Sequence, residues 1–314
     1  MRLRGGLRVL RRTATEVQVG TDPRWAVRLT DLTPSQADLL PDLSAVDPPL
    51  TDLLTQAHLT QDAEVPVPGC PAAVDARIWS LLRPSADGDV VVDARTQRVV
   101  AVLGLGPTGL GIAVGLAAAG VGTVLLDDEH PVRPVDVGPT GYRWTDIGSA
   151  RAAVAARLLR DVAPQVSTDA VRSPDVVVLV ETDVADPHRA PVLVSVGTPH
   201  LSVVVREADT VVGPLVVPGQ GPCLRCLDLH RTAADPGWPT LLDQLRGGAT
   251  ADEPAVTAVV ASGLGTAAVL GHLDGAVGWP PGSVLEVAAP DAIPRQRTWA
   301  VHPDCGCTAL PAAP

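Results

Sequence analysis

The 314-residue sequence predicts an α/β fold with a largely parallel sheet, preceded by a small separate module. From about residue 90, short apolar strand-like runs alternate with helix-like segments, which is typical of a parallel sheet covered by helices. A glycine-rich turn follows one of the strongest strand runs. The first 85 residues lack this alternation. We therefore expect two domains, over residues 1–85 and 90–314.

The N-terminal module is predicted to combine two short strands with two helices. The strands are expected over residues 15–20 and 25–29. Thr33 followed by Pro34 is typical of a helix start, because threonine caps free N–H groups and proline fits the first turn. A second short helix is expected over residues 50–57. This order suggests a winged-helix-like α+β module.

The second domain is predicted from alternating apolar runs. Strands are expected over residues 90–92, 99–103, 123–126, 176–180, 192–196 and 201–205. Helices are expected over residues 112–119, 150–159 and 255–270, the last nearly all apolar. The uncharged stretch 99–126 is long enough to cross a bilayer, but its glycines and Pro107 divide it into strand, turn, helix and strand. A buried core therefore explains it better than a membrane span.

Composition excludes several classes of function. Lysine is absent, so the chain has neither a Schiff-base lysine nor a Walker-type phosphate-binding lysine. The net charge of −11 is a poor match for sequence-independent nucleic-acid binding. Five arginines near the start, ending at Arg12, are expected to be a solvated tail or a small anionic contact, and no apolar signal segment follows them. We expect a cytoplasmic protein with no nucleic-acid partner and no membrane partner.

Gly104, Gly106 and Gly109 form a GxGxxG pattern between a predicted strand and a predicted helix. The first glycine permits a tight turn, the second lets the backbone approach a phosphate, and the third allows helix and strand to pack closely. The start of the helix then attracts an anion. Asp127 and Asp128 end the next strand, where a Rossmann-like fold places the acid that binds ribose hydroxyls. The alternative is a glycine-rich turn that holds no ligand.

Four of the five cysteines form two tight pairs, CxxC at Cys223 and Cys226 and CxC at Cys305 and Cys307. Each pair brings two thiolates to one side of a loop, and two such loops make a tetrahedral site. Four protein ligands leave no open position, so the expected metal is a structural zinc. Disulfides and free thiols are the alternatives. His302 is expected to be a surface histidine.

Together, the glycine pattern, the strand-end acid and the late cysteine pairs resemble the ThiF/MoeB/HesA family, relatives of ubiquitin-activating enzymes. The resemblance extends over about residues 99–307. Its most specific segments are residues 146–148, similar to the family's DIG, and residues 222–226, similar to its PCYRC zinc loop. The resemblance implies a homodimer that adenylates the C-terminal carboxylate of a small protein or peptide, using ATP and Mg²⁺.

The resemblance also implies roles for individual residues. The three glycines of the turn stand at the family's GxGGLG, and Asp128 stands at its ribose-binding acid. Asp183 ends a strand where the family has the aspartate that serves Mg-ATP; the alternative is a helix cap. Arg151 stands at the lysine of DIGxxK and is implied to contact phosphate; the alternative is an exposed helix arginine. Asp183 and Arg151 are therefore the candidate catalytic residues.

Some segments depart from the family pattern. Residues 133–142 contain no counterpart of S-N-L-x-R-Q, so the Arg–Gln pair that handles triphosphate is missing. The forked guanidinium of Arg151 is not geometrically equivalent to a lysine ammonium. No cysteine lies between Leu227 and Pro254, where thioester-forming relatives place theirs, and Cys70 lies in the other module. We therefore expect no thioester relay.

The N-terminal module resembles the leader-peptide-recognition modules that are fused to ThiF-like domains in cyclodehydratase partner proteins. The similarity rests on G-x-D-P at residues 20–23 and on the helix start at residues 32–34. The first hypothesis is an ATP-dependent adenylyltransferase. The second is a non-adenylating scaffold that binds a precursor peptide along a strand edge and presents it to a separate modification enzyme. A third, an NAD-dependent oxidoreductase, leaves the zinc cysteines and the DIG segment unexplained.

Overall fold

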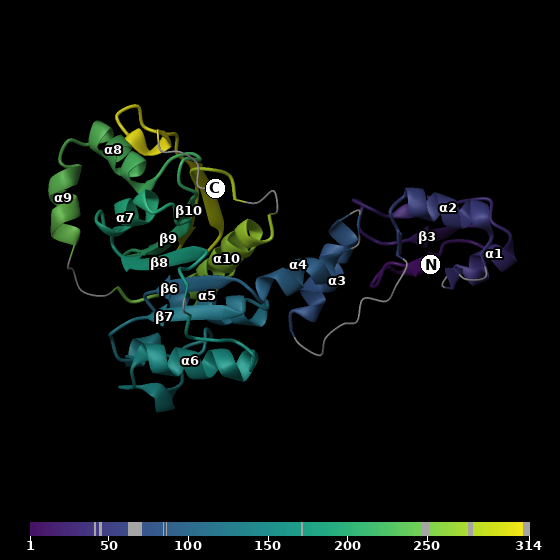
Figure 1. The fold of residues 1–314 in the computed structure, drawn as a ribbon, viewed down its shortest axis with the longest axis horizontal. Coiled ribbons are helices and arrows are strands. Elements are labelled where there is room, and N and C mark those ends of the chain that lie inside the picture. Colours follow the sequence, from purple (N-terminus) through teal and green to yellow (C-terminus); the bar gives the residue numbers. More distant parts are fainter. Residues whose placement is uncertain are drawn as a thin grey trace. The chain divides into compact units, whose positions relative to one another are not determined.

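A computed structural model describes the chain except for residues 41, 44–45, 62–70, 84, 86, 171, 247–250, 276–278 and 310–314. Cys70 therefore lies outside the described residues. The chain divides into two compact units, Met1–Ala94 and Arg95–Pro314 (Figure 1). The candidate functional sites lie in the second unit, and each unit is described by itself.

The first unit combines short strands with short helices. Its three-stranded antiparallel sheet has the order β2 (Val9–Arg11), β3 (Val17–Val19) and β4 (Val27–Leu29), and β1 (Arg2–Leu3) pairs with β5 (Thr60–Gln61). The helices are α1 (Pro34–Leu39), α2 (Pro48–Gln56), α3 (Ala73–Leu82) and α4 (Gly88–Arg95), the last of which ends at the unit boundary. The predicted cap of α1 is confirmed, because Thr33 Oγ1 accepts a hydrogen bond from the Gln36 N–H at 3.2 Å. Strands and helices share a small apolar core that includes Val19, Leu40 and Leu54.

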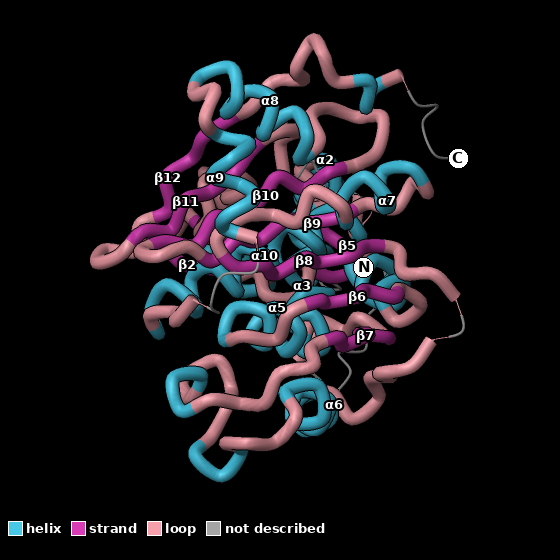
Figure 2. Tube along the Cα trace, turned by 90° about the vertical axis from the view of Figure 1, so that its left-hand side faces the viewer, coloured by secondary structure: helices cyan, strands magenta, loops and turns pink. Residues whose placement is uncertain are grey.

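The second unit is built on one seven-stranded sheet with the order β12-β11-β10-β9-β8-β6-β7 (Figure 2). Its strands are β6 (Val99–Leu103), β7 (Thr123–Asp127), β8 (Val176–Thr182), β9 (His200–Val205), β10 (Asp209–Val216), β11 (Ser283–Ala288) and β12 (Pro294–Thr298). Strands β7, β6, β8 and β9 are parallel to one another, and β10, β11 and β12 continue the sheet in antiparallel fashion. The sheet is therefore mixed, with its parallel half around the glycine-rich turn.

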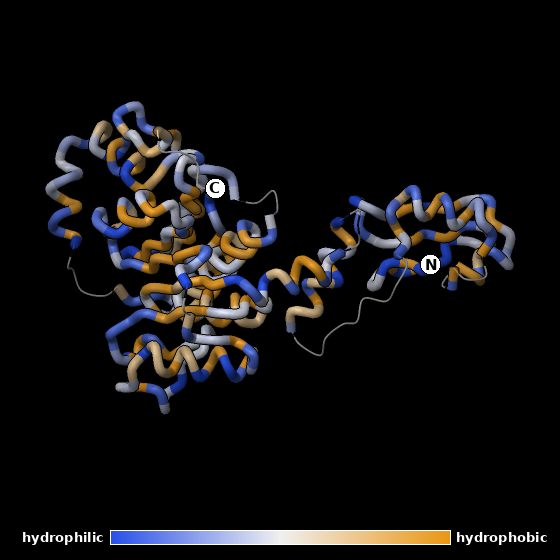
Figure 3. The backbone as a smooth tube through the Cα atoms, viewed as in Figure 1, coloured by the Kyte–Doolittle hydropathy of each residue, from blue (hydrophilic) through white to orange (hydrophobic). Residues whose placement is uncertain are grey.

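Helices and strands bury one large apolar core and two smaller clusters among the described residues of this unit. The helices are α5 (Pro107–Ala118), α6 (Arg151–Val162), α7 (Arg189–Ser195), α8 (Leu224–Ala234), α9 (Trp238–Leu245) and α10 (Ala255–Leu273). Hydrophobic residues gather in the sheet strands (Figure 3). Helix α10 is long and apolar enough to cross a membrane by composition, but it packs against α5 and β10. One face of the helix therefore belongs to the core, whereas Val256 and Val259 on its other side are exposed.

The strands predicted over residues 99–103, 123–126, 176–180 and 201–205 are confirmed as β6, β7, β8 and β9. Two other predicted strands are wrong. Residues 90–92 lie in helix α4 (Gly88–Arg95), and residues 192–195 lie in α7. A strand inside a parallel sheet buries both faces, whereas Val90 is 61% exposed and Val192 is 59% exposed. The two valine runs therefore form partly exposed helices, although valine is favoured in strands.

Candidate active site and metal site

A cavity of about 880 Å³ lies at the carboxyl ends of the parallel strands. Ligands of open α/β sheets bind at this edge. Five of the six residues predicted for nucleotide binding and catalysis line the cavity: Gly104, Gly106, Asp128, Arg151 and Asp183. The sixth, Gly109, lies in the first turn of α5. The fold therefore brings together residues from the turn after β6 and from the ends of β7 and β8.

The turn between β6 and α5 requires glycine at two positions. Gly104 has a φ of +90°, and a Cβ atom there would lie 2.2 Å from the Val180 carbonyl oxygen. A Cβ at Gly109 would lie 1.9 Å from the Gly104 carbonyl oxygen. Larger residues would force β8 or the turn itself to move. This close packing places Gly106, the residue before α5, at the cavity wall. The first N–H groups of a helix have no partner within it.

Asp128 ties the end of β7 to the glycine-rich turn. Its Oδ2 accepts a hydrogen bond from the Leu105 N–H at 2.7 Å, and its Oδ1 accepts one from the His130 N–H at 2.9 Å. Burial raises the pKa of Asp128, but the hydrogen bonds from His130 and Leu105, with the Arg151 charge, outweigh it and hold the pKa below its usual range. Asp128 is therefore a charged residue that fixes the geometry of the turn.

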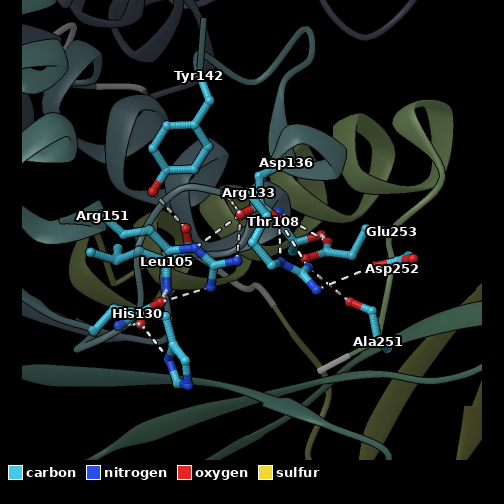
Figure 4. Close-up of polar contacts among 11 residues, drawn as sticks. Leu105, Thr108, His130, Arg133, Asp136, Tyr142, Arg151, Ala251, Asp252 and Glu253 are labelled. Atoms are coloured by element: carbon cyan, nitrogen blue, oxygen red, sulfur yellow. Dashed lines mark hydrogen bonds and ion pairs between the residues drawn. The ribbon is translucent and has the colours of Figure 1, made fainter. Parts of the chain in front are cut away.

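Arg151 lies inside the network, and its side chain is only 6% exposed. The alternative of an exposed helix arginine is therefore wrong. Nη2 contacts Asp136 Oδ2 at 2.5 Å and Nη1 contacts Asp128 Oδ2 at 3.1 Å (Figure 4). Burial lowers the pKa of Arg151, but the two carboxylates outweigh it and raise the pKa above its ordinary value. The guanidinium is thus occupied by two carboxylates, where the resemblance implied a phosphate.

Asp136 is a member of this network that sequence reasoning missed. It ends the short 3₁₀ turn Pro134–Asp136 and also binds Arg133, with Nη2 to Oδ1 at 2.9 Å. Burial raises the pKa of Asp136, but its hydrogen bonds with Arg133 and Arg151 outweigh it and hold the pKa low. A Pro-Val-Asp stretch indicates only a turn in the sequence, so no local pattern relates Asp136 to a helix that begins at residue 151.

Glu253 is the second missed residue, and its carboxylate lies on the start of α5. Oε2 accepts a hydrogen bond from the Thr108 N–H at 3.0 Å and another from the Thr108 hydroxyl (Figure 4). A Cβ built at Gly106 would lie 2.6 Å from Glu253 Oε1. Burial raises the pKa of Glu253 above its usual range. In the sequence, Glu253 looks only like an acid before the start of α10. Its contact with Thr108 could not be predicted, because the two residues are 145 positions apart.

Asp183 follows β8 on the cavity wall and has an unusual backbone conformation. Its φ of +64° lies in the left-handed region, which is uncommon for residues other than glycine and is adopted more often by aspartate and asparagine than by most others. Its N–H donates to the Val205 carbonyl oxygen at 2.7 Å, which holds the residue against the end of β9. The turn before α7 is held instead by Asp186, whose Oδ1 accepts from the His188 N–H at 2.9 Å. Residues other than glycine in this region cluster at functional sites.

The cavity lining carries more acidic than basic groups. The acids are Asp127, Asp128, Glu129, Glu181, Asp183, Asp186, Asp243 and Glu253. The arginines are Arg133, Arg151, Arg189 and Arg246. Arg189 is half-exposed on the cavity wall. An anionic ligand in such a cavity needs a cation in addition to these arginines.

The four paired cysteines meet at a second site, between the start of α8 and the C-terminal segment. The Sγ atoms of Cys223 and Cys305 are 3.7 Å apart, and those of Cys226 and Cys307 are 3.5 Å apart. All four Sγ atoms lie within 4.8 Å of one another and could hold a metal ion. Burial raises the pKa of Cys307 to about 11. Because the thiols are free, the disulfide alternative is not supported.

His302 differs from its prediction as a surface histidine. Its side chain is only 12% exposed, and its ring packs edge-on against His230 at 4.7 Å between centroids. The backbone N–H of His302 helps to hold the pKa of Cys226 below its usual value, against the effect of burial. His302 therefore lies beside the cysteine cluster. Its position three residues before Cys305 in the sequence could have suggested this.

The fold and the two sites define a Rossmann-like α/β protein with a clustered cysteine site. A model of the ThiF family matches residues 86–272, and the chain belongs to this family. None of the curated proteins compared with the chain matches it.

Several solved structures share the fold. The microcin C7 biosynthetic enzyme MccB in complex with N-formylated MccA is 16% identical, with a TM-score of 0.71 over 98% of this chain and 99% of that one. Escherichia coli MccB with ATP is 15% identical, with a TM-score of 0.69 over 98% of both chains. PaaA is 15% identical, with a TM-score of 0.69 over 94% of this chain and 99% of that one. At these identities the likeness concerns the fold.

Replacing Arg151 with alanine is expected to lower the free energy of unfolding by about 3–5 kcal/mol, because Asp128 and Asp136 would be left buried without their shared partner. Denaturant unfolding measures this change. Arg160→Ala, an exposed position on the same helix, is the control and should change the free energy by less than about 0.5 kcal/mol. Equal effects of the two variants would contradict the network.

The pH dependence of the free energy of unfolding is a second test of the network around Arg151. The pKa values of Asp128 and Asp136 are lowered by folding. Their contribution to stability is therefore complete above the ordinary aspartate pKa of about 3.9 and is lost as the pH falls through the lowered values. Arg151→Ala should weaken this dependence, since the guanidinium supplies part of the shift.

Proposed function

We propose that the protein is an ATP-dependent adenylyltransferase that activates the C-terminal carboxylate of a peptide or small protein. One observation carries this proposal. A single cavity contains the glycine-rich turn at the start of α5, the charged Asp128 and the left-handed backbone of Asp183 at the carboxyl ends of parallel strands. Membership of the ThiF family supports it, as do solved relatives whose titles name ATP and the peptide MccA.

The proposed reaction needs positioning and charge neutralisation, and no nucleophilic side chain. An oxygen of the peptide carboxylate attacks the α-phosphorus of ATP, and the bond from that phosphorus to the pyrophosphate oxygen breaks. The products are a peptidyl adenylate and pyrophosphate. The start of α5 is suited to phosphate oxygens, and Arg189 and Arg246 on the wall are suited to the leaving pyrophosphate.

Asp183 is proposed to hold the Mg²⁺, which would neutralise charge on the phosphates when bound. Its carboxylate on the cavity wall fits this role, because oxygen ligands are the ones that Mg²⁺ prefers and the acidic lining favours a divalent cation. Arg151 is assigned a positioning role, since it acts on the glycine-rich turn through Asp128.

We propose that the metal of the cysteine cluster is a structural zinc. Tetrahedral zinc with Zn–S bonds of about 2.3 Å places its sulfurs about 3.8 Å apart. The separations of 3.5, 3.7 and 4.0 Å between neighbouring Sγ atoms fit this geometry. Such an ion would attach the C-terminal segment to α8. A homodimer, a cytoplasmic location and a partner modification enzyme stay predictions from the sequence.

The non-adenylating scaffold is the second candidate. It is favoured by one observation, the carboxylate of Glu253 on the start of α5, which leaves the nucleotide site closed in this conformation. In that case the first unit would hold a precursor peptide, and the cavity would bind no ATP. The two functions differ in whether the chain binds ATP, with or without the first unit.

Deletion of residues 1–85 is expected to leave the affinity for Mg-ATP within about twofold of the full chain, because every proposed nucleotide contact lies at or beyond Gly104. The same deletion should abolish the binding of peptides that the full chain binds. Titration calorimetry with Mg-ATP, and with peptides selected on the full chain, measures both. Loss of peptide binding from a chain that never binds ATP would instead support the scaffold.

A further inference from the structure

We propose that Glu253 is a built-in occupant of the phosphate position and must leave the start of α5 before ATP binds. The inference rests on the proposed function. It assigns this chain an autoinhibitory contact: the segment before α10 competes with the nucleotide for the glycine-rich turn.

The position of the Glu253 carboxylate is the first argument. Its Oε2 accepts hydrogen bonds from the backbone N–H and the hydroxyl of Thr108, in the first turn of α5. Its Oε1 lies 2.6 Å from where a Cβ of Gly106 would be, so the missing side chain at Gly106 makes room for it. Donors at a helix start and an open approach over the second glycine are the features that receive a phosphate.

The surroundings of Glu253 are the second argument. Its side chain is partly buried, and this burial raises its pKa because it disfavours the charged form. Among the residues that the structure describes, no arginine forms an ion pair with Glu253. The helix start is therefore its main source of stabilisation. A bound triphosphate would compete for the same donors and would repel the carboxylate.

The attachment of the neighbouring residues shows how the contact can open. Arg133 contacts Asp252 at 3.2 Å and the Ala251 carbonyl oxygen at 3.5 Å (Figure 4). The Asp252 side chain is exposed, and exposed ion pairs contribute little to stability. Residues 251–253 are thus held by weak surface contacts and by the Glu253 carboxylate itself. Removing the Glu253 carboxylate should therefore release residues 251–253 from the start of α5 without disturbing the sheet.

The test is titration calorimetry of the full chain with Mg-ATP. Glu253→Ala is expected to bind at least about tenfold more tightly than wild type, because the apparent affinity of a closed site is reduced by its open fraction. Glu253→Gln, which keeps the shape and loses the charge, should tighten binding by a smaller factor. Asp161→Ala removes the same charge from an exposed position that does not line the cavity and should change affinity by less than about twofold.

The outcomes separate the inference from the proposed function. Wild-type binding of ATP with unchanged or weaker binding by both Glu253 variants would overturn the inference and leave the proposed function standing. If the Glu253 variants melt at a lower temperature and bind Mg-ATP no more tightly, Glu253 only caps α5 and does not compete with the nucleotide. If neither wild type nor any variant binds ATP while all stay folded, the inference and the proposed function both fail. Should Glu253→Ala not fold, Glu253→Gln decides.

Discussion

Loss of the Asp183 carboxylate is expected to lower the rate of ATP–pyrophosphate exchange by a factor of about 10²–10³. The carboxylate lies on the cavity wall and is proposed to hold the Mg²⁺ that neutralises the phosphates. The choice of substitution matters here. With a φ of +64°, the position is strained for alanine, whereas asparagine tolerates the left-handed region and keeps the size of the side chain. Asp183→Asn therefore removes the charge and little else.

Exchange of labelled pyrophosphate into ATP, with peptide present, measures this effect, and calorimetry with Mg-ATP measures the accompanying loss of affinity. Asp161→Asn is the control, because Asp161 is an exposed carboxylate that does not line the cavity. It should keep exchange within about twofold of wild type. If Asp183→Asn retains full exchange with normal Mg²⁺ dependence, Asp183 does not hold the metal and the proposed site is wrong.

Cys223→Ser is expected to release the bound metal and to lower the free energy of unfolding by about 4 kcal/mol or more, since the binding energy of a structural zinc is part of the folding energy. Cys223 begins α8 and is buried beside Cys226 and Cys305. Its loss would detach the C-terminal segment from this helix. Elemental analysis for zinc and thermal unfolding give the two readouts.

Cys70→Ser is the matched control, because Cys70 lies outside both cysteine pairs in the sequence. It should leave about one zinc per chain and an unchanged melting temperature. A metal-free wild-type protein that keeps full stability with all four thiols free would refute the zinc site. It would leave the nucleotide site untouched, because no cysteine lines that cavity among the residues that the structure describes.

Local patterns predicted the centre of the second unit well. The strand, turn, helix and strand over residues 99–126 were readable because a buried parallel strand is continuously apolar and a glycine-rich turn has strict spacing. The cysteine cluster could be predicted because the CxxC and CxC spacings each place two thiols on one loop. The antiparallel strand β12 carries no such signal, since all its residues are exposed.

Long-range pairing could not be predicted in the same way. For Arg151 the sequence offered a phosphate contact or an exposed helix position, and only the fold shows that Asp128 and Asp136 surround it. Glu253 precedes a helix in sequence but binds at the start of another helix. Both contacts depend on which segments the strand order of the sheet brings together, and no local sequence pattern indicates that order.

Titration of Mg-ATP into the zinc-loaded full chain, with NAD as the comparison ligand, is the most direct test of adenylation. Saturable ATP binding is expected below millimolar nucleotide, tighter in Glu253→Ala and lost in Asp183→Asn, with no comparable binding of NAD. Absence of ATP binding at millimolar nucleotide, in both wild type and Glu253→Ala with the fold intact, would contradict adenylation and leave the peptide-presenting scaffold as the function of this ThiF-family chain.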